Sequence, residues 1–159
     1  MYDAIAKSYD ELHKGEQLKK LNIIKQHLKF SPDSKLLDIG AGTGISTTFF
    51  DCECIGIEPS ESMIKRSSGN VIKGKAESLP FEDSSFDLII STTAIHNFDD
   101  VEKAIKEMKR VGKSKCQFAI TLLKKSKNYD KIRGLLIQNF KTKKEIDEEK
   151  DTIFIMEKK

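Results

Sequence analysis

The stretch Lys35–Gly44, with the sequence KLLDIGAGTG, constrains the fold of this chain more than any other. A short apolar run carries Asp38 near its end, and glycines then occupy every second position at Gly40, Gly42 and Gly44. Glycine has no Cβ, so its backbone can take positive φ and can let a bound group approach closely. The pattern therefore predicts a buried strand that ends in a ligand-binding turn. A surface turn without a ligand is the alternative, because such short motifs also occur by chance.

Apolar segments and amphipathic segments alternate along the rest of the chain. Strands are predicted over residues 35–39, 54–58, 71–73, 86–91, 116–123 and 152–156, the last of which could pair with residues 143–146. Helices are predicted over residues 2–13, 16–28, 45–50, 101–111 and 129–140 and after Pro59, with Gly15 separating the first two. This alternation predicts an α/β fold in which a mostly parallel sheet is covered by helices on both faces.

Open sheets of this kind bind ligands outside the carboxyl ends of their strands. The glycine turn lies at that end of the first predicted strand, and Glu58 ends the second, eighteen residues after Gly40. An acid at this position is placed to accept hydrogen bonds from both hydroxyls of a nucleoside ribose. The alternative is an exposed helix-capping carboxylate before Pro59.

The spacing of the glycines separates two kinds of nucleotide ligand. A dinucleotide motif has the pattern Gly-x-Gly-x-x-Gly, with the pyrophosphate on the helix amino terminus. Here the third glycine, Gly44, arrives one residue early and Ile45 occupies its expected place. This departure disfavours NAD and favours a nucleoside without phosphates.

Composition limits the class of protein. The 159 residues suit one domain, and the net charge of +3 permits an anionic partner without requiring one. No apolar run has the length of a membrane span and no signal segment is present, so we expect a cytoplasmic protein. The three cysteines form neither a disulfide framework nor paired metal ligands, so we expect reduced thiols and no metal.

Four blocks of residues together carry a family resemblance. They are YDxIAxxYD at residues 2–10, the glycine block at residues 36–44, Glu58, and GKAESLPFEDSSFD at residues 74–87. These blocks resemble the class I S-adenosylmethionine-dependent methyltransferases, and in particular the subgroup of ubiquinone and menaquinone biosynthesis methyltransferases (the methyltransferase type 11 domain). The resemblance covers about residues 2–111, and with the length of the chain it leads us to expect one methyltransferase domain over residues 1–159. It also implies a Rossmann-like three-layer sandwich, whose seven-stranded sheet is mostly parallel and has an antiparallel last strand.

The resemblance also implies a cofactor and its site. The cofactor would be S-adenosylmethionine, and S-adenosylhomocysteine the product. The implied cofactor-binding residues are Tyr9, Asp38, Gly40, Ala41, Gly42, Gly44, Glu58, Pro59, Ala76, Glu77 and Thr92. The glycine turn and Thr92 would lie by the methionine part, Glu58 would hold the ribose, and residues 76–77 would lie by the adenine.

Two departures from the family pattern affect the expected site. Lys75 stands where the family commonly has an acid, so adenine recognition would rest on the Ala76 backbone or on Glu77. No substrate-covering insertion follows the fifth predicted strand. We therefore expect a pocket that is open, or covered by the helical segment 1–30 with the help of Tyr9, or covered by another copy of the chain or a partner subunit.

Methyl transfer from a sulfonium is an in-line displacement, and holding the two reactants together supplies much of the acceleration. A base helps only when the acceptor must lose a proton. His96 follows the fourth predicted strand and titrates near neutrality, so it is the candidate catalytic base. The alternative is a polar residue that lines or caps the pocket without proton transfer.

The acceptor is less constrained than the donor. Residues 91–94 lack the Asn/Asp-Pro-Pro-aromatic sequence of many enzymes that methylate amino groups of bases. Lysine runs at residues 124–125, 141–144 and 158–159 could face RNA, but neighbouring acids favour a solvated surface. We expect a small-molecule acceptor. The alternatives are an RNA methyltransferase and a non-catalytic S-adenosylmethionine-binding subunit or regulator of a larger complex.

Overall fold

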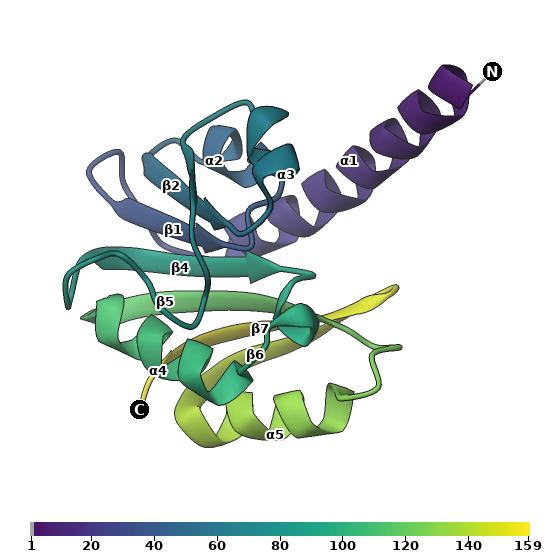
Figure 1. Cartoon of the computed structure of the whole chain (residues 1–159). Coiled ribbons are helices and arrows are strands. Elements are labelled where there is room, and N and C mark those ends of the chain that lie inside the picture. The colour runs from purple at the N-terminus through teal and green to yellow at the C-terminus, as the bar shows by residue number, and fades with distance from the viewer. Residues whose placement is uncertain (1) are drawn as a thin grey trace.

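One seven-stranded sheet organises the chain. The computed structural model describes the backbone of residues 2–159 and the side chains of residues 11–159. Its strands are β1 (Lys35–Ile39), β2 (Glu53–Glu58), β3 (Val71–Lys73), β4 (Phe86–Thr92), β5 (Gly112–Leu123), β6 (Phe140–Glu148) and β7 (Asp151–Lys158). They lie in the order β3-β2-β1-β4-β5-β7-β6 (Figure 1). The last strand, β7, is antiparallel to its neighbours β5 and β6, and the other pairs are parallel. The predicted α/β fold is confirmed.

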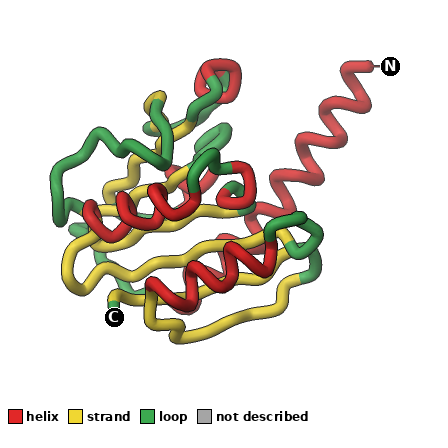
Figure 2. The backbone as a smooth tube through the Cα atoms, turned by 60° about the horizontal axis from the view of Figure 1, so that its bottom comes forward, coloured by secondary structure: helices red, strands yellow, loops and turns green. Residues whose placement is uncertain are grey.

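Helices cover both faces of this sheet and make it a three-layer structure. They are α1 (Tyr2–His27), α2 (Ile45–Phe49), α3 (Glu61–Lys65), η1 (Ile95–Asn97), α4 (Val101–Val111) and α5 (Tyr129–Asn139). Figure 2 shows α4 and α5 lying over one face of the strands. The carboxyl-terminal part of α1 packs on the opposite face, where its residues share a core with Phe50.

Alternating side chains of the strands explain why both faces need a cover. On β4, Ile89 points into the core under α4 and α5, whereas Leu88 and Ile90 point into the core under α1. All three side chains are completely buried. A strand that is buried on both faces is apolar almost throughout, which is the pattern that identified β4 in the sequence.

The amino-terminal helix differs from the prediction. The expected break at Gly15 is wrong, because α1 is one continuous helix of 26 residues whose first half extends away from the sheet (Figure 1). Glycine inside a helix costs only about 0.5–1 kcal/mol relative to alanine, and packing of the following turns offsets that amount. Within residues 2–159, no helix combines the length and the apolar character that crossing a bilayer requires.

Strands β5 and β6 start earlier than predicted because each begins directly after a helix. The N–H of Gly112 bonds to the carbonyl of Met108 and ends α4, and β5 begins at the same residue. The β4–β5 pairing shifts register between Phe86 and Leu88, which accommodates the extra residues. The expected pairing of residues 143–146 with the last strand is confirmed and extends over Phe140–Glu148.

Candidate functional site

A cavity of about 800 Å³ lies at the carboxyl ends of β1, β2 and β4. Strand order reverses beside β1, since the chain proceeds from β1 to β2 on one side and later returns to β4 on the other. Open α/β sheets bind their ligands at such a point. The cavity is lined by the glycine turn, by the ends of β2 and β4, and by one side of α1.

The glycine turn is folded back onto the end of β2. The N–H groups of Gly40 and Ala41 both donate to the carbonyl of Ile57, at 2.8 and 2.9 Å. Gly40, Gly42 and Gly44 have φ values of 77°, 58° and 81°. All three lie in the left-handed region that favours glycine, so the backbone of the turn matches the sequence prediction.

The space available for a side chain differs between the three glycine positions. A Cβ added to Gly40 would lie 2.6 Å from Cβ of Ala94, and one added to Gly44 would lie 2.8 Å from Cγ2 of Val71. A Cβ at Gly42 would meet nothing closer than Cε of Met63 at 3.5 Å. Gly40 and Gly42 line the cavity, whereas Gly44 is absent from its lining and forms the N-cap of α2. Packing therefore explains Gly44, and backbone conformation together with access to the cavity explains Gly42.

Glu58 joins the glycine turn to the turn after β2. Its Oε1 accepts a hydrogen bond from the N–H of Gly42 and its Oε2 accepts one from the N–H of Ser60, both at 2.9 Å. The side chain lines the cavity and is 8% exposed, so the alternative of an exposed capping carboxylate is wrong. Each carboxylate oxygen retains capacity for a second hydrogen bond, which a ligand can use.

Asp38 lies under the same turn in an apolar environment. Burial raises the pKa of its carboxyl from 3.8 to about 7; the hydroxyl of Ser46, which donates to Oδ2, opposes this rise, and the charge of Glu58 adds to it. Oδ1 is buried and has no hydrogen-bond partner among the described residues. Because the pKa lies near neutrality, Asp38 can hold a proton or, when ionised, can face a cationic group in the cavity.

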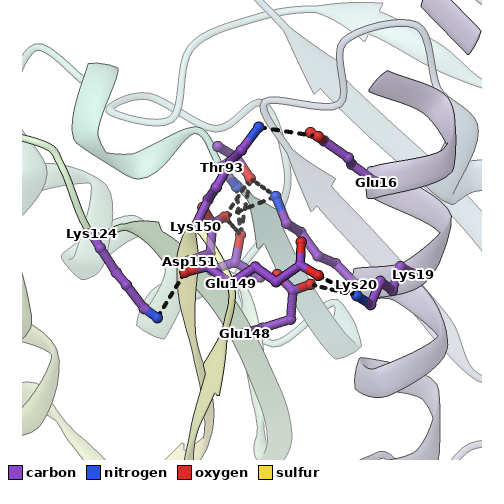
Figure 3. A network of polar contacts seen from close by, with 10 residues as sticks. Glu16, Lys19, Lys20, Thr93, Lys124, Glu148, Glu149, Lys150 and Asp151 are labelled. Atoms are coloured by element: carbon purple, nitrogen blue, oxygen red, sulfur yellow. Dashed lines mark hydrogen bonds and ion pairs between the residues drawn. The ribbon is translucent and has the colours of Figure 1, made fainter. Parts of the chain in front are cut away.

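The segment after β4 forms another wall. Thr92 and Thr93 both line the cavity, and Thr93 takes a φ of 50°, which is costly for a residue with a branched Cβ. Its N–H donates to Oγ1 of Thr121 at 2.7 Å, and its hydroxyl donates to Oδ2 of Asp151 at 2.6 Å. Lys20 donates to the same hydroxyl at 3.2 Å (Figure 3). These bonds fix the backbone beside Thr92.

His96 lies in η1, next to this wall. Burial lowers the pKa of its imidazole, and the charge of Asp151 opposes the shift, so the ring is neutral at neutral pH. Nδ1 is buried and has no partner among the described residues. His96 itself is absent from the cavity lining, although the following residues Asn97 and Phe98 belong to it. Its role as a base stays a prediction.

The remaining predicted residues lie at different distances from the cavity. Pro59 lines it, whereas Ala76 is buried in the core under α4 and α5. Glu77 accepts a hydrogen bond from the N–H of Asp100 at 3.0 Å, and neither Ala76 nor Glu77 belongs to the lining. Tyr9 is part of α1 but lies outside the residues whose side chains the structure describes.

Two side chains of α4 form hydrogen bonds with the loop that carries residues 76–77. Arg110 donates to the carbonyls of Leu79 and Phe81 at 3.0 and 2.8 Å, and Glu107 accepts from the N–H of Leu79 at 2.8 Å. Gly74, at the start of the loop, donates to the carbonyl of Glu58 at 3.2 Å. The loop is thereby fastened beside the end of β2.

Sequence reasoning missed four lining residues of α1, namely His13, Lys14, Gln17 and Leu21. Only Leu21 followed a pattern, and that pattern placed it in the core, where it also lies. No motif marks Gln17, because its contact with the cavity depends on how α1 crosses the sheet.

The comparison with protein families agrees with this geometry. Residues 37–120, which include the glycine turn, Glu58 and the β4 wall, match the model described as "Methyltransferase domain". This chain belongs to the methyltransferase domain family. The resemblance to S-adenosylmethionine-dependent methyltransferases is confirmed at the level of the family.

Two relatives show how similar this methyltransferase-family chain is to individual proteins. It is 40% identical over 101 residues to the Bacillus subtilis methyltransferase YcgJ, a match that covers 55% of this chain and 40% of the relative. It is 31% identical over 123 residues to the demethylmenaquinone methyltransferase of Corynebacterium glutamicum, covering 71% and 54%. The chain spans about half the length of the curated relatives it matches.

A solved structure shows that the fold extends over the full chain. The crystal structure of an S-adenosylmethionine-dependent methyltransferase from Thermotoga maritima superposes with a TM-score of 0.76. The match covers 99% of this methyltransferase-family chain and 98% of the other, at 23% identity. At that identity the likeness concerns the fold, including α1 and the β6–β7 pair.

Proposed function

We propose that this chain transfers the methyl group of S-adenosylmethionine to a small-molecule acceptor. The observation that carries the proposal is the link from Gly42 through Glu58 to Ser60 at the edge of the cavity. It places backbone of positive φ and a carboxylate together at the ends of β1 and β2. The volume of about 800 Å³ lies within the range of small-molecule sites.

The residues around the cavity fit the parts of the cofactor. The free capacity of the Glu58 carboxylate suits the ribose hydroxyls, while Gly40, Ala41 and Gly42 leave room for the methionine part beside Asp38. Thr92 would face the same part, and Pro59 would border the ribose. Ala76 and Glu77 remain assigned to the adenine through the family resemblance, on a loop that Gly74 fastens to β2.

We further propose that residues 1–159 act as one domain in which α1 covers part of the cavity. His13, Lys14, Gln17 and Leu21 of this helix belong to the lining. The acceptor would enter between α1 and the segment after β4. The sulfonium carries its own leaving group, so the protein contributes chiefly by aligning the acceptor with the methyl group. A neutral His96 would serve as base for an acceptor that loses a proton.

Charges on the surface favour a small molecule over RNA. Lys124 pairs with Asp147, and Lys141 and Lys143 lie 3.5 and 3.9 Å from Oε1 of Glu157. A basic surface that binds RNA presents cations without such compensation. Lys124, Lys141 and Lys143 are therefore partly compensated by neighbouring acids, which favours a solvated surface over an RNA-binding one.

Calorimetric titration with S-adenosylmethionine, followed by labelling of a cell extract with methyl-labelled cofactor, tests the proposal. We expect binding, and label in a fraction of low molecular mass. Label confined to RNase-sensitive material would contradict the small-molecule acceptor. Binding without any incorporation would instead favour a non-catalytic cofactor-binding subunit, and absence of binding would refute the cofactor assignment.

A further inference from the structure

The side chain of Gln17 has an unusual environment for a helix residue. Gln17 lines the cavity, and its Oε1 is buried without a hydrogen-bond partner among the described residues. A buried amide oxygen without a partner is unfavourable compared with the same oxygen in water or in a hydrogen bond. A donor group bound in the cavity removes this deficit when the side-chain amide turns toward it.

The helical turn that carries Gln17 is held in place by charge. Lys19 donates to Oε1 of Glu149 at 2.7 Å, and Lys20 lies 3.2 Å from Oδ2 of Asp151. Glu16 accepts a hydrogen bond from Lys150 at 3.1 Å. Figure 3 shows these side chains joining α1 to the turn between β6 and β7. Gln17 lies beside Glu16, Lys19 and Lys20, whose contacts hold this part of α1 in place. The side-chain amide of Gln17 can therefore reorient while its backbone stays fixed.

A second acceptor without a partner lines the same cavity. Oδ1 of Asp38, at the end of β1, is buried and has no hydrogen-bond partner in the described part of the chain. Gln17 and Asp38 both border this cavity, and an ammonium group has three N–H donors, so one ammonium can serve Gln17 and an ionised Asp38 together. S-adenosylmethionine carries one ammonium, at its amino-acid end, which the proposed arrangement puts beside the glycine turn.

We propose that Gln17 is a cofactor-binding residue whose side-chain amide accepts a hydrogen bond from the α-ammonium group of S-adenosylmethionine. This inference rests on the proposed function and extends the site to α1, beyond the residues that match the family model. It assigns the amino-terminal helix a specific contact with the cofactor in addition to its role as a cover.

Two probes isolate the contact. S-adenosylhomocysteine contains the amino-acid end, whereas 5′-methylthioadenosine has the same nucleoside and sulfur without it. We compare the wild type with Gln17→Leu and Gln17→Met, which remove the amide, and with Gln17→Glu, which keeps an acceptor. Gln26→Leu is the matched control, because Gln26 is an exposed glutamine on the same helix. Thermal unfolding of each variant checks the fold.

The Kd of S-adenosylhomocysteine is expected to rise about tenfold to a hundredfold in Gln17→Leu and Gln17→Met, as for the loss of a hydrogen bond to a charged group. The Kd of 5′-methylthioadenosine should not change, and Gln17→Glu and Gln26→Leu should bind both probes like the wild type. Equal binding of S-adenosylhomocysteine by Gln17→Leu would overturn the inference alone. Equal losses for both probes, or weak binding by Gln17→Glu, would also overturn it. A wild type that binds neither probe would refute the proposed function itself.

Discussion

The ammonium of Lys20 lies 3.2 Å from Oδ2 of Asp151, and the two side chains are 7% and 0% exposed. The same carboxylate oxygen accepts hydrogen bonds from the hydroxyls of Thr93 and Thr121. The pair thus joins α1 to the start of β7 and also holds the wall after β4. A buried charge depends on its partner, since removal of either one leaves the other charge in an apolar environment.

Replacement of Lys20 by methionine should therefore lower the free energy of unfolding by about 3–5 kcal/mol, because Asp151 is left buried without its cation. Urea denaturation measures the effect. The double variant Lys20→Met/Asp151→Leu should recover a large part of the loss. Lys73→Met is the control: Lys73 and Glu61 form an exposed pair, and its loss should cost less than about 1 kcal/mol. Similar costs for Lys73→Met and Lys20→Met would contradict this account of the buried pair.

Glu58→Ala should weaken the binding of S-adenosylmethionine by at least about 1.5–3 kcal/mol, the usual size of a hydrogen bond to a charged group. The variant would lose the proposed ribose contact, and the N–H groups of Gly42 and Ser60 would lose their acceptors. Titration calorimetry gives the affinity. Glu61→Ala is the matched control, because Glu61 is an exposed acid that pairs with Lys73 outside the cavity. Unchanged affinity in Glu58→Ala would refute the ribose assignment.

Gly40→Ala should destabilise the fold more than Gly42→Ala. The new methyl at Gly40 would lie 2.6 Å from Cβ of Ala94, whereas the one at Gly42 would make an ordinary contact with Cε of Met63 at 3.5 Å and incur only the cost of positive φ, about 1–2 kcal/mol. Thermal unfolding orders the two variants. The double variant Gly40→Ala/Ala94→Gly relieves the contact and should unfold closer to the wild type. If Gly40→Ala proves no less stable than Gly42→Ala, the packing explanation for Gly40 is wrong.

The raised pKa of Asp38 makes the stability depend on pH. Between its ordinary pKa of 3.8 and the folded value of about 7, the folded chain holds a proton that the unfolded chain releases. The stabilisation is therefore complete at low pH and is lost as the pH rises through 7, at a slope of up to about 1.4 kcal/mol per pH unit. Asp38→Asn cannot titrate, so its free energy of unfolding should fall less between pH 5 and 7. Parallel curves for the wild type and Asp38→Asn would argue against a buried, protonated Asp38.

The sequence alone was sufficient for the features that depend on neighbours along the chain. Apolar runs such as residues 86–91 predicted the strands, because a strand covered on both faces needs apolar side chains at nearly every position. The glycines at positions 40, 42 and 44 predicted the turn, because only glycine takes their φ values without strain. The order of these elements then located the cavity at the ends of the strands.

Tertiary structure decided the features that depend on contacts between distant parts of the chain. Gly15 was predicted to end a helix, but the turns that follow it are held to the start of β7 by the buried ion pair of Lys20 with Asp151. Glu58 has a second role because its carboxylate meets the backbone of Gly42. Gln17 reaches the cavity only because α1 crosses the sheet at that point. The conformational propensities of residues and the spacing of motifs describe local conformation. The contacts named here depend instead on the order of the strands in the sheet and on which helix covers them.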